Sequence, residues 1–270
     1  MKRYAEITRE TAANLRIIDD ALFRLVAEKK DVCQEILRTL LDMPGLQVIK
    51  VEAQSIVQSL HREITLDALC IVNNKDYCNI EMQKGNSNDD IARTRFHASA
   101  ITAKYTPKGT DFRDIPSVTI LYITEYDSLG NGQTVTHVNR CMRIKNGYVP
   151  VYDGEDIVFA NTAIKDGSDK SELLQLMLHK NSFDNAKFPA ISSAIRYFKD
   201  TEGGRYEVCK TIETYAQGLI LEAVEETRMD AIRNVMKNGR CSFEEAIRML
   251  GIPAGEQEVY KRMYEDSLVC

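Results

Sequence analysis

The stretch HREITLDALCIVNNKDYCNIEMQ, residues 61–83, decides how the rest of the chain is interpreted. Two runs rich in apolar residues flank the sequence NNKD, whose residues favour turns, and this pattern is typical of a β-hairpin. Polar residues nevertheless interrupt both runs: Asp67 in the first, and Glu81 and Gln83 in the second. These three residues belong either to a solvent-facing side of the sheet or to a functional site.

The connection between the two predicted strands decides whether the polar residues meet. Alternate residues of a strand share a face, so Glu81 and Gln83 point the same way and Met82 points to the other side. An even-numbered loop would place Asp67 across from Met82. An odd loop or one bulge would place Asp67 opposite Glu81, with Cβ atoms about 5 Å apart. The functional interpretation therefore predicts an odd loop or a bulge.

Two carboxylates at this distance form a plausible metal site. Magnesium prefers carboxylate oxygens and keeps several waters, so Asp67 and Glu81 together with a substrate phosphate are enough to hold it. Without a cation between them the two carboxylates repel each other, and burial increases the cost. The alternative is a half-exposed hairpin in which Thr65, Asp67, Glu81 and Gln83 are ordinary outward-facing polar residues.

The composition fits a globular protein of one domain with a smaller appendage. The chain has 270 residues, of which 44% are hydrophobic and 28% charged. Its seven cysteines show no zinc-ligand spacing and are predicted to be reduced thiols. It has no predicted leader or membrane span, so a cytoplasmic location is expected. The net charge of -5 means that any nucleic-acid site is local, or completed by a homodimer.

The order of predicted elements indicates a mixed α/β sheet followed by helices. Asp19 and Asp20 are candidates to cap a first helix, and the apolar periodicity of residues 31–42 predicts a second. A predicted helix between strands implies a mixed sheet. The strands are expected at residues 46–54, 63–72, 77–83, 117–127, 134–144 and 148–161, and the intervening helix at 91–105. The pattern becomes helical near residue 170, so we predict domains at 1–170 and 171–270.

Four segments together resemble a known nuclease group. They are IIDDALFRLV, REITLDALCIVNNKDYCNIEMQ, RTRFHASAI and VTILYITEYDSLGNG, which begin at residues 17, 62, 93 and 118. The order and content of these segments are similar to those of the recombination-promoting nuclease (Rpn) group, often described as PD-(D/E)XK nuclease family transposases. The resemblance covers roughly residues 15–165. It implies a restriction-endonuclease-like mixed sheet flanked by helices, followed by a helical C-terminal region.

The resemblance also implies a set of catalytic roles. Asp67 and Glu81 would be the metal-binding carboxylates of a DNA endonuclease dependent on Mg²⁺ or Mn²⁺, linked to recombination or mobile-element DNA. Gln83 would occupy the position where the wider superfamily has a lysine. Glutamine can orient water through hydrogen bonds, but it cannot stabilise developing charge as strongly as lysine.

Four further residues are candidates with less specific signals. Glu35 is the candidate for an additional acidic metal ligand from an early helix, although it falls opposite the apolar stripe, so solvated surface is the favoured interpretation. Arg62, Arg93 and Arg95 are candidates for contacts with DNA phosphates, or members of an ordinary charged surface. The histidines at positions 61, 97, 137 and 179 show no metal-ligand spacing.

A second functional class competes with the nuclease. The missing lysine and the acidic net charge favour a catalytically weak nuclease-fold module that binds DNA or another protein. The C-terminal segment, residues 241–266, reads as a short helix pair in which Ser242 and Glu245 fit a capping box. Because this segment has few basic residues, packing or dimerisation is the favoured role over helix-turn-helix DNA binding.

Overall fold

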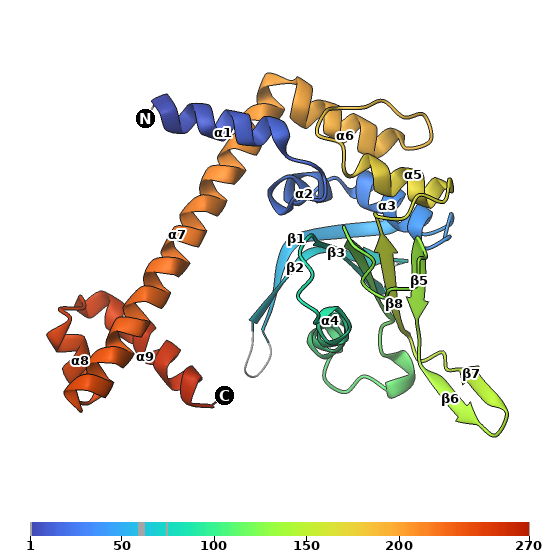
Figure 1. The fold of residues 1–270 in the computed structure, drawn as a ribbon. Helices are drawn as coiled ribbons and strands as arrows, with labels where there is room; N and C mark the ends of the chain where they lie inside the picture. The colour runs from blue at the N-terminus through green and yellow to red at the C-terminus, as the bar shows by residue number, and fades with distance from the viewer. Residues whose placement is uncertain (1, 59–62, 74, 270) are drawn as a thin grey trace. The chain divides into compact units, whose positions relative to one another are not determined.

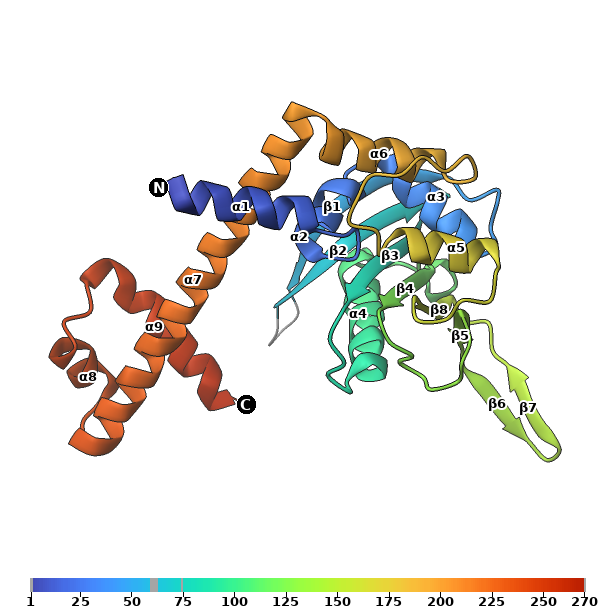
Figure 2. The same ribbon diagram turned by 45° about the horizontal axis from the view of Figure 1, so that its top comes forward.

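The computed structural model describes residues 2–58, 63–73 and 75–269 and contains a mixed sheet with helices on both faces (Figures 1 and 2). The six strands lie in the order β1-β2-β3-β4-β8-β5. They are β1 (Val48–Gln58), β2 (Glu63–Val72), β3 (Asp76–Gln83), β4 (Val118–Thr124), β8 (Glu155–Asn161) and β5 (Val135–Val138). Strands β3, β4 and β8 are mutually parallel, and the other neighbours are antiparallel. The predicted mixed sheet is confirmed, and its restriction-endonuclease-like character stays a prediction.

Two strand predictions were wrong in length. Residues 134–144 form β5 and then a separate strand, β6 (Cys141–Ile144), and residues 148–161 form β7 (Gly147–Pro150) and then β8. Strands β6 and β7 pair with each other in a two-stranded sheet of their own. The apolar pattern continues through both strand pairs, and it therefore did not reveal where the chain leaves the main sheet.

Helices cover the two faces of the sheet unequally. Figure 1 shows α2, α3, α5 and α6 on one face and α4 on the other. The first-face helices are α2 (Asp20–Ala27), α3 (Lys30–Leu40), α5 (Asp169–Leu176) and α6 (Pro189–Asp200), and α4 spans Asp90–Tyr105. The stripe that predicted α3 is buried, since Val32, Ile36, Leu37 and Leu40 are all 0% exposed.

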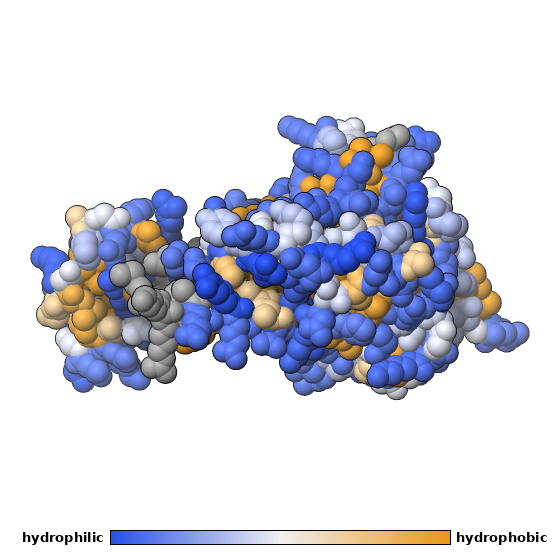
Figure 3. All heavy atoms as spheres, turned by 90° about the horizontal axis from the view of Figure 1, so that it is seen from above, coloured by the Kyte–Doolittle hydropathy of each residue, from blue (hydrophilic) through white to orange (hydrophobic). Residues whose placement is uncertain are grey.

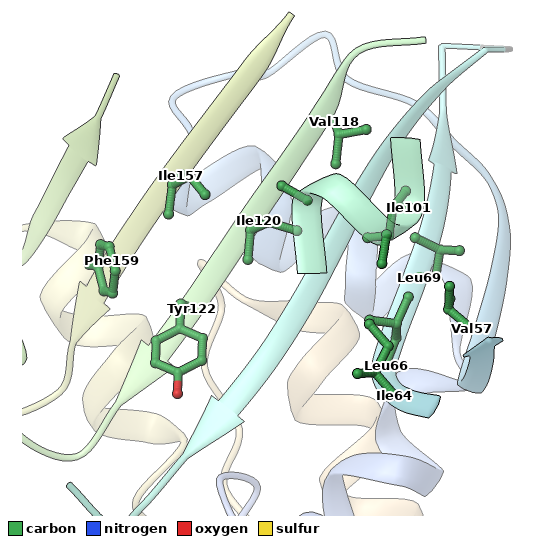
Figure 4. Close-up of a cluster of buried hydrophobic side chains, with 12 residues drawn as sticks. Val57, Ile64, Leu66, Leu69, Ile101, Val118, Ile120, Tyr122, Ile157 and Phe159 are labelled. Atoms are coloured by element: carbon green, nitrogen blue, oxygen red, sulfur yellow. The ribbon is translucent and has the colours of Figure 1, made fainter. Parts of the chain in front are cut away.

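The core beneath α4 joins five strands of the sheet. Figure 4 shows side chains from β1, β2, β4 and β8 meeting Ile101 of α4. Tyr122 of β4 is 1% exposed and packs edge-on against Phe159 of β8, with ring centroids 5.7 Å apart. Tyr77 of β3 packs against the same cluster. This core fixes α4 against the face on which the odd-numbered residues of β3 lie.

The two capping predictions had different outcomes. Ser242 and Glu245 form the predicted capping box at the start of α8 (Phe243–Met249). Asp19 does occupy the N-cap position of α2, but its side chain makes no capping hydrogen bond. Its carboxylate instead pairs with Arg16 and with Lys84, at 3.1 and 2.7 Å. Asp19 therefore has the predicted position but not the predicted hydrogen bond, because Arg16 and Lys84 bind its carboxylate in place of the backbone N–H groups of α2.

The chain divides into two compact units, residues 1–210 and 211–270. This division lies beyond the boundary predicted near residue 170, because α5 and α6 contact α3 and belong to the first unit. The first unit also contains α1 (Lys2–Asn14), and α7 (Glu202–Gly239) runs from the first unit into the second. In the second unit, Phe243, Ile247 and Tyr260 share a core with Met229 and Ile232, so α8 and α9 (Ala254–Val269) pack onto the end of α7.

The surface is mostly polar. Figure 3 shows hydrophilic residues over most of the face seen from above, with apolar residues in small separate patches. Within the described residues, each helix is too short or too polar to span a membrane.

A tight corner between α6 and α7 depends on one of two adjacent glycines. A Cβ atom added to Gly204 would overlap the carbonyl of Tyr197 and approach the Cα of Phe198 to 2.7 Å. A Cβ atom on Gly203 would meet only the hydroxyl of Tyr197, at 3.6 Å. Both glycines lie in the first turn of α7, and the break between α6 and α7 is at Thr201.

We predict opposite effects for the two alanine variants. Gly204→Ala should lower the free energy of unfolding by about 1 to 3 kcal/mol, because the overlapping atoms belong to backbone. Gly203→Ala should raise it by about 0.5 kcal/mol through the reduced entropy of the unfolded chain. Urea unfolding followed by circular dichroism measures both, and equal midpoints for the two variants would contradict the prediction.

Candidate active site

The predicted odd connection between β2 and β3 is confirmed. Val72 pairs with Asp76, so three residues separate the paired positions, and Ala68 pairs with Ile80. The same register, continued by one residue, places Asp67 opposite Glu81. The register set by the short connection between β2 and β3 thus aligns the two carboxylates.

The ladder between β2 and β3 stops at these two residues, and side chains replace it. The Ala68–Ile80 pair is the last in the ladder. Beyond it, the backbone N–H of Met82 donates to Oδ2 of Asp67 at 2.9 Å, and the N–H of Asp67 donates to Oε1 of Glu81 at 3.4 Å. The carboxylates therefore lie where the two strands part, each near the backbone of the opposite strand.

A distortion in β1 and β2 accompanies this opening. Pairing passes from Ala53–Ala68 to Ser55–Leu66, and Gln54, opposite Asp67, has a φ of 54°. Left-handed backbone is rare for residues other than glycine. Leu66 and Leu69 both face the core under α4, although strict alternation would place them on opposite faces (Figure 4). The strand changes phase at Asp67.

Glu81 is the more deeply held carboxylate, with 7% of its surface exposed. The Nδ2 of Asn79, which is fully buried, donates to Oε1 of Glu81 at 2.5 Å. Nδ1 of His97, from α4, lies 3.3 Å from the same oxygen. His97 is 5% exposed and its Nδ1 has no hydrogen-bond partner among the described residues. Asn79 and His97 thus surround one oxygen of Glu81 and fix the direction of the other.

His97 was missed by the sequence analysis, which searched for metal-ligand spacings. The signal that could have identified it is helical phase. Thr94, His97, Ala98 and Ile101 recur at three- and four-residue intervals and are all buried on the sheet side of α4. A histidine on such a stripe must meet the polar residues of the sheet below it.

The electrostatic environment favours the protonated form of Asp67. Burial, and then the neighbouring Glu81 carboxylate, raise the pKa of Asp67 to about 8. Asp20 also raises it, whereas the Met82 N–H and Arg24 lower it. Asp20 and Arg24 form a two-point ion pair at 3.2 and 3.0 Å on α2, so this helix brings two further charges towards the site. Their i,i+4 spacing was the available signal for this pair.

The candidate residues converge on one cleft of about 630 Å³ between the parted strands and α4. The strands contribute Asp67, Glu81 and Gln83, and α4 contributes Arg93 and Arg95. These are five of the seven residues singled out from the sequence. Arg62, the sixth, lies outside the described residues.

The polar groups around the carboxylates differ in how firmly they are held. The side-chain amide of Gln83 donates to the carbonyl of Gly85 at 2.5 Å. Arg93 pairs with Asp89 at 2.8 Å, while its Nε is buried without a partner in the described part of the chain. Arg95 is exposed at the cleft. A phosphate entering the cleft would therefore meet both a partly buried and a solvated arginine.

Glu35 lies in a different environment. Its Oε1 and Oε2 accept hydrogen bonds from the backbone N–H groups of Ala190 and Ile191, at 3.0 and 2.9 Å, and so cap the start of α6. Burial raises the pKa of Glu35. The prediction of solvated surface was wrong, because α6 covers the side of α3 that looked exposed. Both carboxylate oxygens serve the cap, and the structure does not bring Glu35 together with Asp67 and Glu81.

Two carboxylates that lie opposite each other, rather than a group of three or more ligands, are what this cleft offers to a metal. Among the described residues there is no group of three or more His, Cys, Asp or Glu side chains arranged to hold a metal. Zinc sites usually need three or four such protein ligands, whereas magnesium is commonly held by one or two carboxylates, waters and substrate phosphates. The Asp67–Glu81 pair fits the second type.

Comparison with protein-family models, with curated proteins and with solved structures gave no match. The function is therefore inferred from the residues of the cleft and from their geometry.

The raised pKa of Asp67 predicts a distinctive pH dependence of stability in the absence of metal. The unfolded chain releases the Asp67 proton near pH 4, whereas the folded protein keeps it until about pH 8. The free energy of unfolding therefore falls as pH rises from about 4 to 8. Asp67→Asn should remove that fall and make the protein more stable than wild type by about 2 kcal/mol at pH 8.

Thermal melting across this pH range in a chelator checks the prediction. Glu63→Gln removes a carboxylate from an exposed position of the same strand and serves as the control. An Asp67→Asn curve parallel to wild type, or a matching gain in Glu63→Gln, would contradict the assignment.

Proposed function

We propose that the protein is a metal-dependent DNA endonuclease that hydrolyses phosphodiester bonds. The observation that carries the proposal is the convergence of Asp67, Glu81 and Gln83 with Arg93 and Arg95 in one cleft. The register puts the two carboxylates opposite each other, and the arginines come from a helix that packs on the same face. Carboxylates, cations and a water-orienting amide are the groups that phosphodiester hydrolysis needs.

Each residue has a role that follows from its position. Asp67 and Glu81 would hold Mg²⁺ or Mn²⁺, which when bound lowers the pKa of water and balances charge on the leaving oxygen. Asn79 and His97 orient Glu81 from behind. Gln83 lies two residues after Glu81 on the same strand, and therefore on the same face, and would orient the attacking water through its amide.

The DNA contacts of this site come from α4. Arg93 and Arg95 would bind phosphate oxygens at the rim of the cleft. Because the chain has a net charge of -5, the DNA site is local, or completed by a second subunit in a homodimer. The resemblance to the Rpn group supports DNA of recombination or mobile elements as the substrate. A cytoplasmic location, expected from the sequence, belongs to the same proposal.

A second candidate function is a nuclease-fold module with weak catalysis. Gln83 favours it, because a neutral amide that already donates to Gly85 cannot stabilise negative charge in the transition state as a lysine would. The two candidates differ in cleavage, and both are compatible with metal and DNA binding.

Nicking of supercoiled plasmid with Mg²⁺ or Mn²⁺ tests the proposal. Asp67→Asn and Glu81→Gln should each reduce the rate at least about a hundredfold, because each weakens metal binding with little change of shape. Glu63→Gln, which removes a carboxylate at the cleft rim, should nick at the wild-type rate. Equal rates in all four proteins would overturn the proposal. Metal-dependent thermal stabilisation without any nicking would favour the binding module.

Substitution of Gln83 separates orientation from charge. Gln83→Ala should slow nicking about tenfold through loss of the amide, whereas Gln83→Lys should exceed the wild-type rate by supplying positive charge. Single-turnover rates at saturating metal measure both variants. If Ala, Lys and Gln give the same rate, the residue at position 83 does not contribute to the reaction.

A further inference from the structure

An isolated β-ribbon projects from the main sheet of the first unit. It consists of β6, β7 and their flanks, residues 139–152, and we call it the β6–β7 arm (Figure 1). Every residue from Cys141 to Pro150 is exposed, and the two strands pair only with each other. An isolated two-stranded hairpin is marginally stable in water, so binding to a partner would stabilise this arm.

The arm has two chemically different faces. Arg143 pairs with Tyr148, and Met142 pairs with Val149. Alternation therefore puts Arg143 and Tyr148 on one face and Met142, Ile144 and Val149 on the other. Tyr148 is 71% exposed, and Met142 and Ile144 are 54% and 51% exposed.

The arm is locally basic in an acidic chain. Residues 139–152 contain Arg140, Arg143 and Lys145 and no Asp or Glu, while the whole chain carries a net charge of -5. Arg140 pairs with Asp153 and Glu155 and so fixes the base of the arm. Arg143 and Lys145 have no ion-pair partner among the described residues. The uncompensated positive charge is therefore at the tip.

We propose that the β6–β7 arm is a second contact of this protein with double-stranded DNA, an inference that rests on the proposed nuclease function. Arg143 and Lys145 contact phosphates, and Tyr148 lies against the groove on the same face as Arg143. A two-stranded ribbon fits the major groove, which is about 12 Å wide.

The arm lies far from the Asp67–Glu81 pair along the sheet, so it can contribute to DNA affinity without contributing to the rate of hydrolysis. Glu81 lies level with Tyr122 and Phe159 across β4 and β8, towards the ends of these parallel strands. The arm instead enters β8 before Glu155, at the strand's beginning. At about 3.3 Å per residue, the two contacts lie several residue lengths apart along the sheet. Loss of the arm contact should therefore weaken DNA binding and leave the single-turnover rate at saturating DNA unchanged.

Binding of a labelled DNA duplex, followed by fluorescence anisotropy in a chelator at several salt concentrations, tests the inference. The double variant Arg143→Ala/Lys145→Ala should weaken binding at least about tenfold at low salt and reduce the slope of log K against log salt by about 2. Tyr148→Ala should weaken binding with an unchanged slope. The control Lys261→Ala/Arg262→Ala removes the same charge from α9 and should bind as wild type.

The outcomes distinguish failure of the arm inference from failure of the nuclease proposal. Arm variants that bind like the control, or that bind single strands with the same arm dependence, overturn the inference. Arm variants with unchanged DNA affinity but altered sedimentation assign the arm to self-association and also overturn it. If no protein nicks DNA while binding stays arm-dependent, the nuclease proposal fails and the arm inference stands. If cleavage persists and binding is independent of the arm, the reverse holds.

Discussion

The arrangement of the first unit depends on holding two acidic side chains opposite each other at the point where β2 and β3 part. Two neighbouring carboxylates withdrawn from water repel each other, and here Glu81 is buried and Asp67 half-buried. The unit accommodates them through hydrogen bonds from Met82 and Asn79 and through the raised pKa of Asp67, about 8, which favours its protonated form. This constraint explains why the ladder ends at Ala68. A continued backbone ladder would leave neither carboxylate with a donor from the opposite strand.

The position of α4 follows from a second buried acid. Asp90, in the first turn of α4, accepts hydrogen bonds from the hydroxyls of Tyr122, Tyr126 and Ser128, at 3.2, 2.8 and 2.5 Å. Tyr122 belongs to β4, and the other two belong to the segment that follows it. A helix start anchored in this way cannot slide along the sheet. The anchor therefore sets where His97, two turns later, meets Glu81.

The sequence predicted those features that depend on local chemistry. The alternation in β3 and the odd spacing between the paired residues Val72 and Asp76 suffice to align Asp67 with Glu81, because both act within one hairpin. The odd spacing was itself predicted from the functional interpretation, since the sequence alone left an even loop open. The phase change at Gln54 was not predictable, since it requires β1 to pair with β2 and α4 to select the face on which Leu66 and Leu69 meet. Helical periodicity similarly put Glu35 on an exposed side, because its partners are backbone groups of α6, more than 150 residues away.

The two carboxylates were easier to identify from the sequence than the residues that hold them in place. Asp67 and Glu81 stand out because a carboxylate inside an apolar strand conflicts with its neighbours, and that conflict is visible in a single segment. Asn79 and His97 cause no such conflict on their own.

A divalent metal bound as proposed would compete with the proton on Asp67 for the same oxygens. Burial and the neighbouring Glu81 carboxylate raise the pKa of Asp67 to about 8, so at neutral pH the protonated form of Asp67 is favoured. Binding of a metal to both carboxylates must release that proton, so affinity for metal rises with pH until Asp67 is ionised. The burial that makes the pair costly without metal also makes it a stronger ligand set once the proton has left. One geometric feature, the parted hairpin, thus sets the cost of ionising both carboxylates and, under the proposed function, the strength with which the ionised pair would hold a metal.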